Sequence, residues 1–392
     1  MKRVVAVILA SFLAFPLLAQ DEEGPGSAKG ASVDTTGKGY TSAYVIEPKS
    51  GRVLFEENAD VPLPTASMAK MMTLLITLEE IAAGNLKWDT QVTVSPNASR
   101  MGGSQVYLRA GSVWPVKNLV IATMVHSAND AATALAEHIA GSQDAFADMM
   151  NRRADELGLT QSRFFDPHGL PPEDPSRNDV MSAKDLAKLG VELMKHPFMR
   201  QLAVIPEMEF RNGTLARIYN PNRLVNPKRP EYYAEATGIK TGYSGPAGYS
   251  ITASAKRGDM ELVAVVTGAK SPSGPLSSFG IAKRLFNEAF QGNRMVTPVK
   301  KGEAVGQAAV TDGAVETVQA VAAQDVSALV KRGEEKNVKV SFSGSTVTAP
   351  VRQGQQVGTV VVTSGSETIA RVPAVAATNV EKEAWWKAFW PF

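Results

Sequence analysis

The sequence predicts an α+β protein followed by a small all-β module and a C-terminal helix, and three observations support this fold class. Between residues 38 and 294, strand-like alternation stands at both ends and helical periodicity fills most of the middle. Near Met295 the composition shifts toward Val, Ala, Gly and Thr in short alternating runs, which are typical of a β module. An aromatic cluster ends the chain of 392 residues. We therefore expect two folded domains, at residues 38–294 and 295–378.

Residues 1–19 have the pattern of a signal peptide. Lys2 and Arg3 precede an apolar stretch that is short for a spanning helix, which needs about 20 apolar residues. Cleavage after Ala19 is expected, and an uncleaved membrane anchor is the alternative. Residues 20–37 are rich in Gly, Ser, Asp and Glu and are expected to be a flexible linker. We expect the rest of the chain to be exported, to the periplasm or to the outer face of the cytoplasmic membrane.

The elements of the larger domain follow in order. Residues 43–46 and 52–55 flank a Pro-Lys-Ser-Gly segment and predict a β-hairpin. An apolar run with helical periodicity follows from Met68 to Ile81. Ser182, with Asp185 three residues later, predicts the N-cap of another helix. Further elements are helices at residues 118–125, 131–140, 144–157, 182–194 and 279–290, a Pro-rich loop at 169–176, and adjacent antiparallel strands at 249–255 and 261–268.

The last stretch, residues 379–392, is expected to be an amphipathic helix that lies on a membrane surface. It is too short to span the bilayer. The alternative is that its aromatic side chains pack back onto the β module. Four aromatic residues share one face at helical spacing: Trp385, Trp386, Phe389 and Trp390.

Composition excludes several classes of function. The net charge of +2 gives no electrostatic argument for binding nucleic acid. The absence of Cys excludes a disulfide framework, a thiol nucleophile and a cysteine zinc site. The four His residues form no metal-ligand pattern, and no phosphate or dinucleotide loop is present, so neither metal nor cofactor is expected. His126 stands beside Ser127, but a Ser-His-Asp site would lack its G-x-S-x-G turn.

Three short motifs, in this order, point to the chemistry. Ser67–Lys70 has the pattern S-x-x-K, Ser127–Asn129 the pattern S-x-N, and Lys240–Gly242 is K-T-G. Together they form the signature of penicillin-interacting serine acyl-transfer enzymes. Each motif alone has an ordinary explanation: Ser67 and Ser127 could be helix N-caps, and the third motif could be a turn between strands. Three such accidents in the right order are improbable.

The first motif provides a nucleophile and a base. On a helix, positions i and i+3 lie on one face, so Lys70 can reach the Ser67 hydroxyl. A serine hydroxyl attacks only when a base removes its proton, and lysine is a base only when neutral. Burial, a helix N-terminus or a second cation can lower the lysine pKa, and Lys240 would be that cation.

The other two motifs provide proton transfer and substrate binding. Ser127 can pass a proton between Lys70 and the leaving amine, and Asn129 can hold a substrate amide. Lys240 and Thr241 can bind a carboxylate. Gly242 is expected to let the substrate backbone approach closely.

Beyond the motifs, the chain resembles the low-molecular-mass penicillin-binding proteins that act as D-alanyl-D-alanine carboxypeptidases. The resemblance extends over roughly residues 38–375 and includes the C-terminal β domain, and the aromatic tail resembles the membrane-association helix of the family. The segments that carry it best are residues 64–73, 127–132, 135–137, 168–170, 238–243, 247–249 and 354–362.

This resemblance implies a fold of antiparallel sheet flanked by helices, with a helical subdomain, as in β-lactamases and DD-peptidases. It implies removal of the terminal D-alanine from peptidoglycan stem pentapeptides through an acyl-serine intermediate, with β-lactams as covalent inhibitors. It also implies an oxyanion hole made of the backbone N–H groups of Ser67 and Tyr243.

One segment departs from the family pattern. Many members carry an arginine, shortly after the strand that follows the third motif, that helps to bind the terminal carboxylate of the substrate. Residues 268–275 contain no arginine here. Lys270 could substitute, or Lys240 and Thr241 could suffice.

Three other functions remain open. A β-lactamase would need a carboxylate that activates water, for which Glu173 is the one nearby candidate. A D,D-endopeptidase would cut peptidoglycan cross-links, although its relatives usually lack a β domain and tail. A catalytically silent wall-binding scaffold would not need intact motifs.

Overall fold

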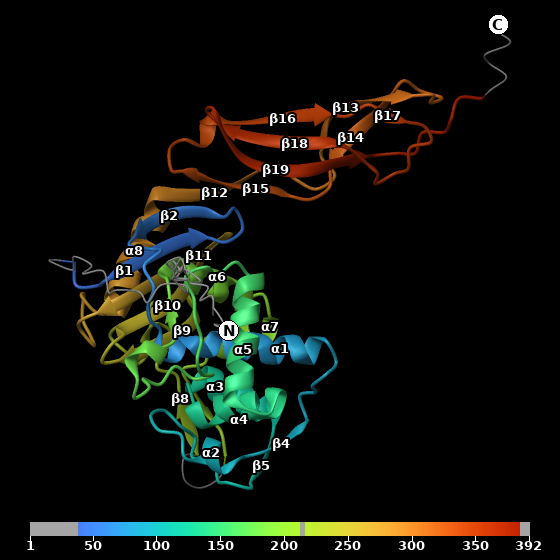
Figure 1. Cartoon of the computed structure of the whole chain (residues 1–392). Coiled ribbons are helices and arrows are strands. Elements are labelled where there is room, and N and C mark those ends of the chain that lie inside the picture. Colours follow the sequence, from blue (N-terminus) through green and yellow to red (C-terminus); the bar gives the residue numbers. More distant parts are fainter. Residues whose placement is uncertain (1–37, 212–215, 385–392) are drawn as a thin grey trace, which may run out of the picture. The chain divides into compact units, whose positions relative to one another are not determined.

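A computed structural model describes residues 38–211 and 216–384 (Figure 1). The signal peptide and linker expected at residues 1–37 lie outside the described residues, as do residues 385–392 of the tail. Among the described residues, no helix is long and apolar enough to cross a membrane.

A five-stranded antiparallel sheet forms the centre of the larger domain, with strand order β2-β1-β11-β10-β9. The predicted N-terminal hairpin and the predicted strand pair are both present, and they meet where β1 pairs with β11. Figure 1 shows β1 beside β11. The strands are β1 (Ser42–Glu47), β2 (Arg52–Glu57), β9 (Ala236–Ser244), β10 (Gly248–Arg257) and β11 (Met260–Ala269).

Helices cover both faces of this sheet, which explains why β11 is apolar along nearly its whole length. Val263 and Val265 belong to the core that the helices of one side build, and Leu262 and Val266 belong to the core built with α8 (Ser278–Gly292). Successive side chains of a strand point to opposite faces, so one strand can serve two cores. The prediction of an antiparallel sheet flanked by helices is confirmed.

The predicted helices of the larger domain are present with similar bounds, and the short helices α2 and α7 were not predicted. Ser182 caps α6 as predicted, since its hydroxyl accepts the Asp185 N–H. The N-cap of α4 is Ala128, so Ser127 does not have the ordinary capping role. The bounds are α1 Lys70–Ala82, α2 Pro96–Ser99, α3 Val116–Val125, α4 Asn129–Ala140, α5 Gln143–Glu156, α6 Ala183–Leu193 and α7 Pro197–Ala203, with 3₁₀ turns η1 Ala66–Ala69, η2 Pro175–Arg177, η3 Arg223–Val225 and η4 Glu335–Asn337.

Three two-stranded sheets connect loop segments of the larger domain. The pair β3 and β6 matters for function, because it joins the segment before Ser67 to the chain at Val180. The pairs are β3 (Leu63–Pro64) with β6 (Val180–Met181), β4 (Gln91–Thr93) with β5 (Val113–Pro115), and β7 (Glu207–Glu209) with β8 (Arg217–Tyr219).

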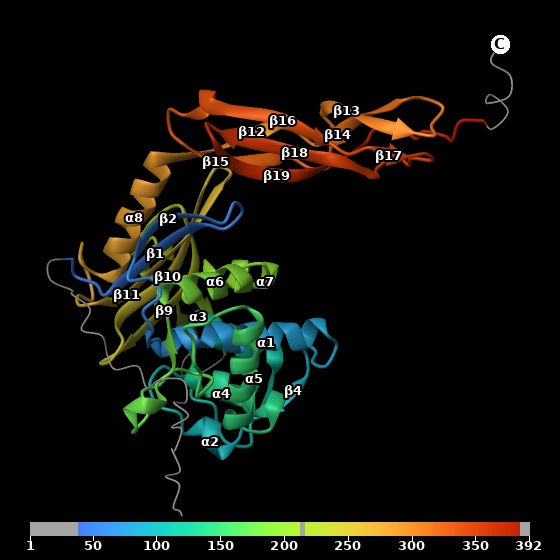
Figure 2. The ribbon, with the colours of Figure 1, turned by 45° about the horizontal axis from the view of Figure 1, so that its top comes forward.

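The C-terminal domain is all-β, as predicted. Its sheet has the order β16-β18-β19-β14-β13-β17, and a separate pair joins β12 to β15. Figure 2 shows β18 between β16 and β19. Small Val and Ala side chains fill its core. The strands are β12 Asn293–Val299, β13 Ala304–Thr311, β14 Thr317–Ala322, β15 Val326–Lys331, β16 Val338–Gly344, β17 Val347–Thr348, β18 Gln356–Ser364 and β19 Glu367–Ala376.

The prediction that the tail helix begins at residue 379 is wrong. Residues 379–384 contain no helical turn, and Val380 exchanges two backbone hydrogen bonds with Val351. Lys382 forms a further bridge with Gly313. Val380 is buried in the core of the β domain, so long-range pairing decides the local conformation. The aromatic residues of the predicted helix lie outside the described residues.

Candidate active site

The first motif forms as predicted, although Ser67 lies on a 3₁₀ turn rather than on the α-helix. Ser67 belongs to η1, and Lys70 is the first residue of α1. In a 3₁₀ turn, side chains at i and i+3 lie one directly above the other. The Lys70 Nζ atom is therefore 2.9 Å from the Ser67 Oγ atom. Ser67 remains partly open to solvent while Lys70 is fully buried.

The second motif lies between α3 and α4. Ser127 adopts the left-handed backbone conformation, with φ of 61°. This conformation is uncommon outside glycine and is typical of functional sites that the surrounding structure holds in place. The Asn129 N–H donates to Ser104 O at 2.7 Å, and its Nδ2 donates to Gly102 O at 2.7 Å. The buried Oδ1 of Asn129 has no partner among the described residues, so it is available to a ligand.

A buried carboxylate holds the loop that faces Asn129. Asp130 accepts the N–H groups of Val106 and Leu108 at 3.1 and 2.9 Å. These bonds fix residues 102–108 against the start of α4. The sequence reasoning did not identify Asp130 as a site residue, because nothing in the motif requires it.

The third motif lies on β9, the edge strand of the sheet. The Lys240 Nζ atom is 2.7 Å from Ser127 Oγ and 3.3 Å from Thr241 O. Gly242 was expected to make room for the substrate backbone. Its close neighbour in the structure is the protein backbone, because a Cβ atom at this position would lie 2.6 Å from Thr65 O. Glycine at this position lets β9 pack against the segment before Ser67. Tyr243 is exposed and stacks on Tyr249 with ring centroids 4.3 Å apart.

Both lysines have a pKa below the ordinary value of a lysine. Burial lowers the pKa of Lys70 well below its ordinary value, and the charge of Lys240 lowers it further. Burial alone lowers the pKa of Lys240 to about 7. Lys70 can therefore be a neutral base at neutral pH, which agrees with the effects of burial and a second cation expected from the sequence.

These groups meet at one cavity of about 500 Å³. Lys70 and Lys240 are buried, and each donates a hydrogen bond to a serine that lines the cavity. Arg223, on η3, was not identified from the sequence, and among the described residues it is the one charged side chain on the wall. The predicted residues that line the cavity are Ser67, Ser127, Asn129, Thr241, Gly242 and Tyr243.

Other candidates from the sequence lie elsewhere. Glu173 is exposed and lines a different recess, together with Asp144 and Arg177. The Nδ1 atom of His126 contacts the backbone of Tyr219 rather than the Ser127 hydroxyl. Within residues 38–211 and 216–384, no group of three His, Cys, Asp or Glu residues could hold a metal ion.

The sequence profile of a peptidase family, S11, described as D-alanyl-D-alanine carboxypeptidase, matches residues 32–271. The chain belongs to this family. A second profile, that of the penicillin-binding protein 5 C-terminal domain, matches residues 294–382. The second match includes Val380 and Lys382, in agreement with their pairing in the β domain.

Individual relatives agree with the family assignment. D-alanyl-D-alanine carboxypeptidase DacF of Bacillus subtilis (strain 168) is 34% identical over 345 residues, which cover 87% of this chain and 86% of the relative. The crystal structure of penicillin binding protein 5 from Haemophilus influenzae has a TM-score of 0.74 at 26% identity, covering 88% of this chain and 98% of that chain. Ampicillin-bound penicillin-binding protein D2 from Listeria monocytogenes has a TM-score of 0.57 at 27% identity, covering 65% of this chain and 99% of that chain.

Proposed function

We propose that this chain is a serine-type D-Ala-D-Ala carboxypeptidase, which removes the terminal D-alanine from peptidoglycan stem pentapeptides. One observation carries the proposal. Two serine–lysine pairs, Ser67 with Lys70 and Ser127 with Lys240, open onto one cavity with N–O distances of 2.9 and 2.7 Å. The family match over residues 32–271 supports the same reaction.

In the acylation step, Ser67 Oγ attacks the carbonyl carbon of the penultimate D-alanine while neutral Lys70 takes the hydroxyl proton. The C–N bond to the terminal D-alanine then breaks. The proton returns to the leaving nitrogen by way of Ser127, whose hydroxyl Lys240 orients. In deacylation, water attacks the acyl carbon, Lys70 takes a proton from the water, and Ser67 regains its own. Penicillin would acylate the same hydroxyl.

The backbone N–H groups of Ser67 and Tyr243 would stabilise the oxyanion of both tetrahedral intermediates. Gly242 supports this arrangement, because it lets β9 approach the segment that carries Ser67. A donor of this kind contributes about 3–4 kcal/mol to acyl transfer.

For the terminal carboxylate we propose Arg223 as the partner of Thr241, in place of the arginine that residues 268–275 lack. Arg223 Nη1 donates to Glu231 at 3.1 Å and to Pro272 O at 3.2 Å, and the guanidinium lies over the Phe279 ring. These contacts hold a planar donor on the cavity wall, and such a donor can bind a carboxylate through two parallel bonds. Lys270 is less well placed to bind the carboxylate, because it lines a neighbouring recess rather than the cavity that contains Ser67.

The competing reactions have weaker support. Glu173 does not line the cavity that contains Ser67, so a deacylating carboxylate of the β-lactamase kind has no candidate there among the described residues. A D,D-endopeptidase would use the same catalytic groups. The matched C-terminal domain favours the carboxypeptidase, because endopeptidase relatives usually lack it.

Product analysis separates these reactions. The mature protein would be incubated with a stem pentapeptide, a cross-linked muropeptide and a penicillin in parallel. We expect release of free D-alanine to be the main reaction, with slow turnover of penicillin. Faster cleavage of the cross-link would favour the endopeptidase, and rapid turnover of penicillin the β-lactamase. No product from any of the three would favour a silent scaffold.

The location of the protein is also part of the proposal. Signal cleavage after Ala19 and an aromatic tail would place the enzyme at the outer face of the cytoplasmic membrane. The tail would bind as an interfacial segment rather than span the bilayer.

A further inference from the structure

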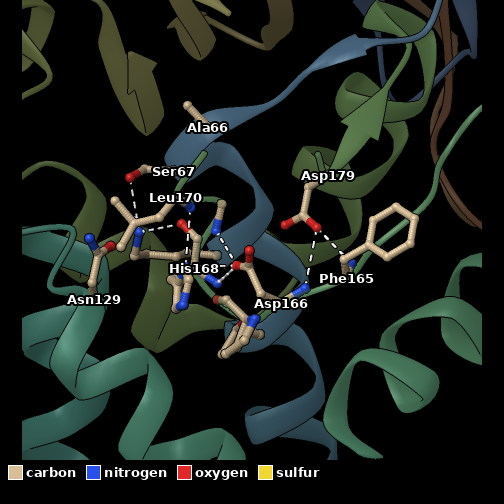
Figure 3. A network of polar contacts seen from close by, with 12 residues as sticks. Ala66, Ser67, Asn129, Phe165, Asp166, His168, Leu170 and Asp179 are labelled. Atoms are coloured by element: carbon tan, nitrogen blue, oxygen red, sulfur yellow. Dashed lines mark hydrogen bonds and ion pairs between the residues drawn. The ribbon is translucent and has the colours of Figure 1, made fainter. Parts of the chain in front are cut away.

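A loop that packs against Lys70 contains two acidic side chains, Asp166 and Asp179, that the mechanism above does not use. Figure 3 shows His168 and Leu170 next to the turn that carries Ser67, with Asp166 and Asp179 farther from Asn129. The loop joins α5 to β6. Asp179 is buried and Asp166 is partly buried, and both carboxylates accept backbone N–H groups.

Asp166 fixes the turn formed by the next three residues. Its Oδ1 atom accepts the N–H of His168 at 2.8 Å and the N–H of Gly169 at 2.6 Å. The same oxygen lies 2.7 Å from His168 Nδ1. Burial raises the pKa of Asp166, but the His168 ring and these N–H groups outweigh that effect and bring the pKa below its ordinary value. Asp166 is therefore an anion.

The proton on the His168 ring follows from this charge. Nδ1 is 2.7 Å from the Asp166 carboxylate and 3.1 Å from the Leu170 nitrogen. If Nδ1 had no proton, its lone pair would face the negatively charged Asp166 Oδ1 atom at 2.7 Å, and the two would repel. Nδ1 must therefore carry a proton and donate it to Asp166, and Leu170 N–H then has no hydrogen bond to this atom.

The turn held by Asp166 meets the first turns of α1 through two successive carbonyl groups. His168 O accepts a hydrogen bond from Lys70 Nζ at 2.6 Å, and Pro167 O accepts one from Thr73 Oγ1 at 2.6 Å. Gly169, with φ of 74°, packs so closely on Ala66 that any Cβ atom would clash with the Ala66 carbonyl. The Lys70 amine is thus held between the loop and Ser67.

Asp179 joins the same loop to the other side of the nucleophile segment. Its Oδ1 accepts the N–H of Phe165 at 2.6 Å, and its backbone oxygen accepts the N–H of Thr65 at 3.0 Å. Burial, together with the charge of Asp166, raises the pKa of Asp179 well above its ordinary value. Of the two carboxylates, Asp166 is therefore the one that ionises more readily.

The charged groups that face Lys70 come from three directions. Lys240 on β9 lowers the pKa of Lys70, while Asp166 and Asp179 on the loop and Asp130 on α4 raise it. His168 faces Lys70 through its backbone oxygen. Among these groups, Asp166 combines the charge with the hydrogen bonds that place the carbonyl.

We propose that Asp166 is a positioning residue for proton transfer: its carboxylate holds residues 167–169 so that His168 O keeps the Lys70 amine directed at Ser67. This inference rests on the proposed role of Lys70 as the base. It assigns the placement of that base to a residue outside the three motifs.

Two substitutions separate the charge of Asp166 from its geometry. Asp166→Asn keeps the shape and one acceptor oxygen but removes the charge, and Asp166→Glu keeps the charge but displaces the oxygen. Asp174→Asn is the matched control, because Asp174 is an exposed carboxylate in the same loop that accepts the Ser176 N–H. The measurement is the second-order rate of acylation by a fluorescent penicillin across pH, with thermal unfolding of each variant.

We expect both Asp166 variants to acylate about 10- to 100-fold more slowly than the parent at the pH optimum, as for a displaced catalytic group. The acylation rate should fall at low pH, where Lys70 is protonated and cannot be the base. In Asp166→Asn this acid limb of the pH profile should move to lower pH, because loss of a negative charge lowers the pKa of Lys70 further. In Asp166→Glu the acid limb should stay in place. Asp174→Asn should match the parent in both rate and limb.

The proposal is overturned if Asp166→Asn keeps the parent's rate and acid limb. It is also overturned if the rate falls equally at all pH values with a lower melting temperature, or if Asp166→Asn does not fold, since Asp166 would then be merely structural. These results differ from a failure of the proposed function itself, in which the parent protein would not be acylated at Ser67 at all.

Discussion

Lys240 Nζ lies 2.7 Å from Ser127 Oγ, although the two residues are 113 positions apart in the sequence. This contact joins the edge strand of the sheet to the turn between α3 and α4. It places a cation beside the hydroxyl that, in the proposed mechanism, passes a proton to the leaving group. Because both partners are buried, the contact ties the two halves of the site together.

Lys240→Arg should keep part of the activity, since arginine retains the positive charge beside Ser127. Arginine is longer and planar, so we expect a fall in kcat/KM of about 10-fold or more rather than full loss. Lys240→Ala should lose far more. Steady-state release of D-alanine from a pentapeptide measures both variants, and equal rates for Arg and Ala at position 240 would contradict the electrostatic role.

Lys70→Arg should abolish acylation while leaving substrate binding intact. Arginine keeps the charge but does not lose its proton in proteins, so it cannot take the Ser67 proton. Stopped-flow acylation by a fluorescent penicillin measures the chemical step, and equilibrium binding of a pentapeptide to the variant measures affinity. Acylation at the parent's rate would show that Lys70 is not the base.

The pH profile should have an alkaline limb that belongs to Lys240. As the pH rises through about 7, Lys240 of the free enzyme loses its proton. Burial and the charge of Lys240 hold the pKa of Lys70 well below its ordinary value, so we assign the acid limb of the profile to Lys70. We therefore expect kcat/KM for a pentapeptide to fall above about pH 7, and we expect Lys240→Arg to remove that fall, because arginine stays charged. An unchanged alkaline limb in Lys240→Arg would contradict this assignment.

Arg223→Gln should weaken recognition of a free carboxylate. A hydrogen bond to a charged group contributes about 1.5–3 kcal/mol, so kcat/KM for the pentapeptide should fall about 10- to 100-fold. The same peptide with a C-terminal amide should lose much less. Arg229→Gln, at an exposed site in the same stretch, is the control. Equal losses with acid and amide would mean that Arg223 acts through its bond to Glu231 alone.

Removal of residues 385–392 should release the protein from membranes. The truncation must end at Ala384 rather than at Thr378, because Val380 is part of the core of the β domain. Flotation of the mature protein on liposomes, with and without these residues, measures binding. The charges at Glu381, Lys382, Glu383 and Lys387 cancel, so binding of the intact protein should be mainly apolar and should survive high salt. Equal flotation of both forms would exclude the tail as the anchor.

The sequence predicted what depends on local spacing. The contact of Ser67 with Lys70 follows from three-residue spacing in a helical turn, and the covered sheet follows from apolar strand patterns. It did not predict Asp166, Asp179 or Arg223, which reach the site through loops without periodicity. The expected helix at residues 379–384 is wrong for a related reason. The helical pattern came from the aromatic residues that follow, whereas Val380 pairs with Val351, far away in the sequence.

Covalent labelling decides whether Ser67 is the acylated nucleophile. The mature protein and Ser67→Ala would be treated with penicillin, and intact mass and peptide mapping would locate any adduct. We expect one stable ester, on the peptide that contains Ser67, and none in the variant. An adduct on another residue, or no adduct on the parent protein, would contradict this expectation.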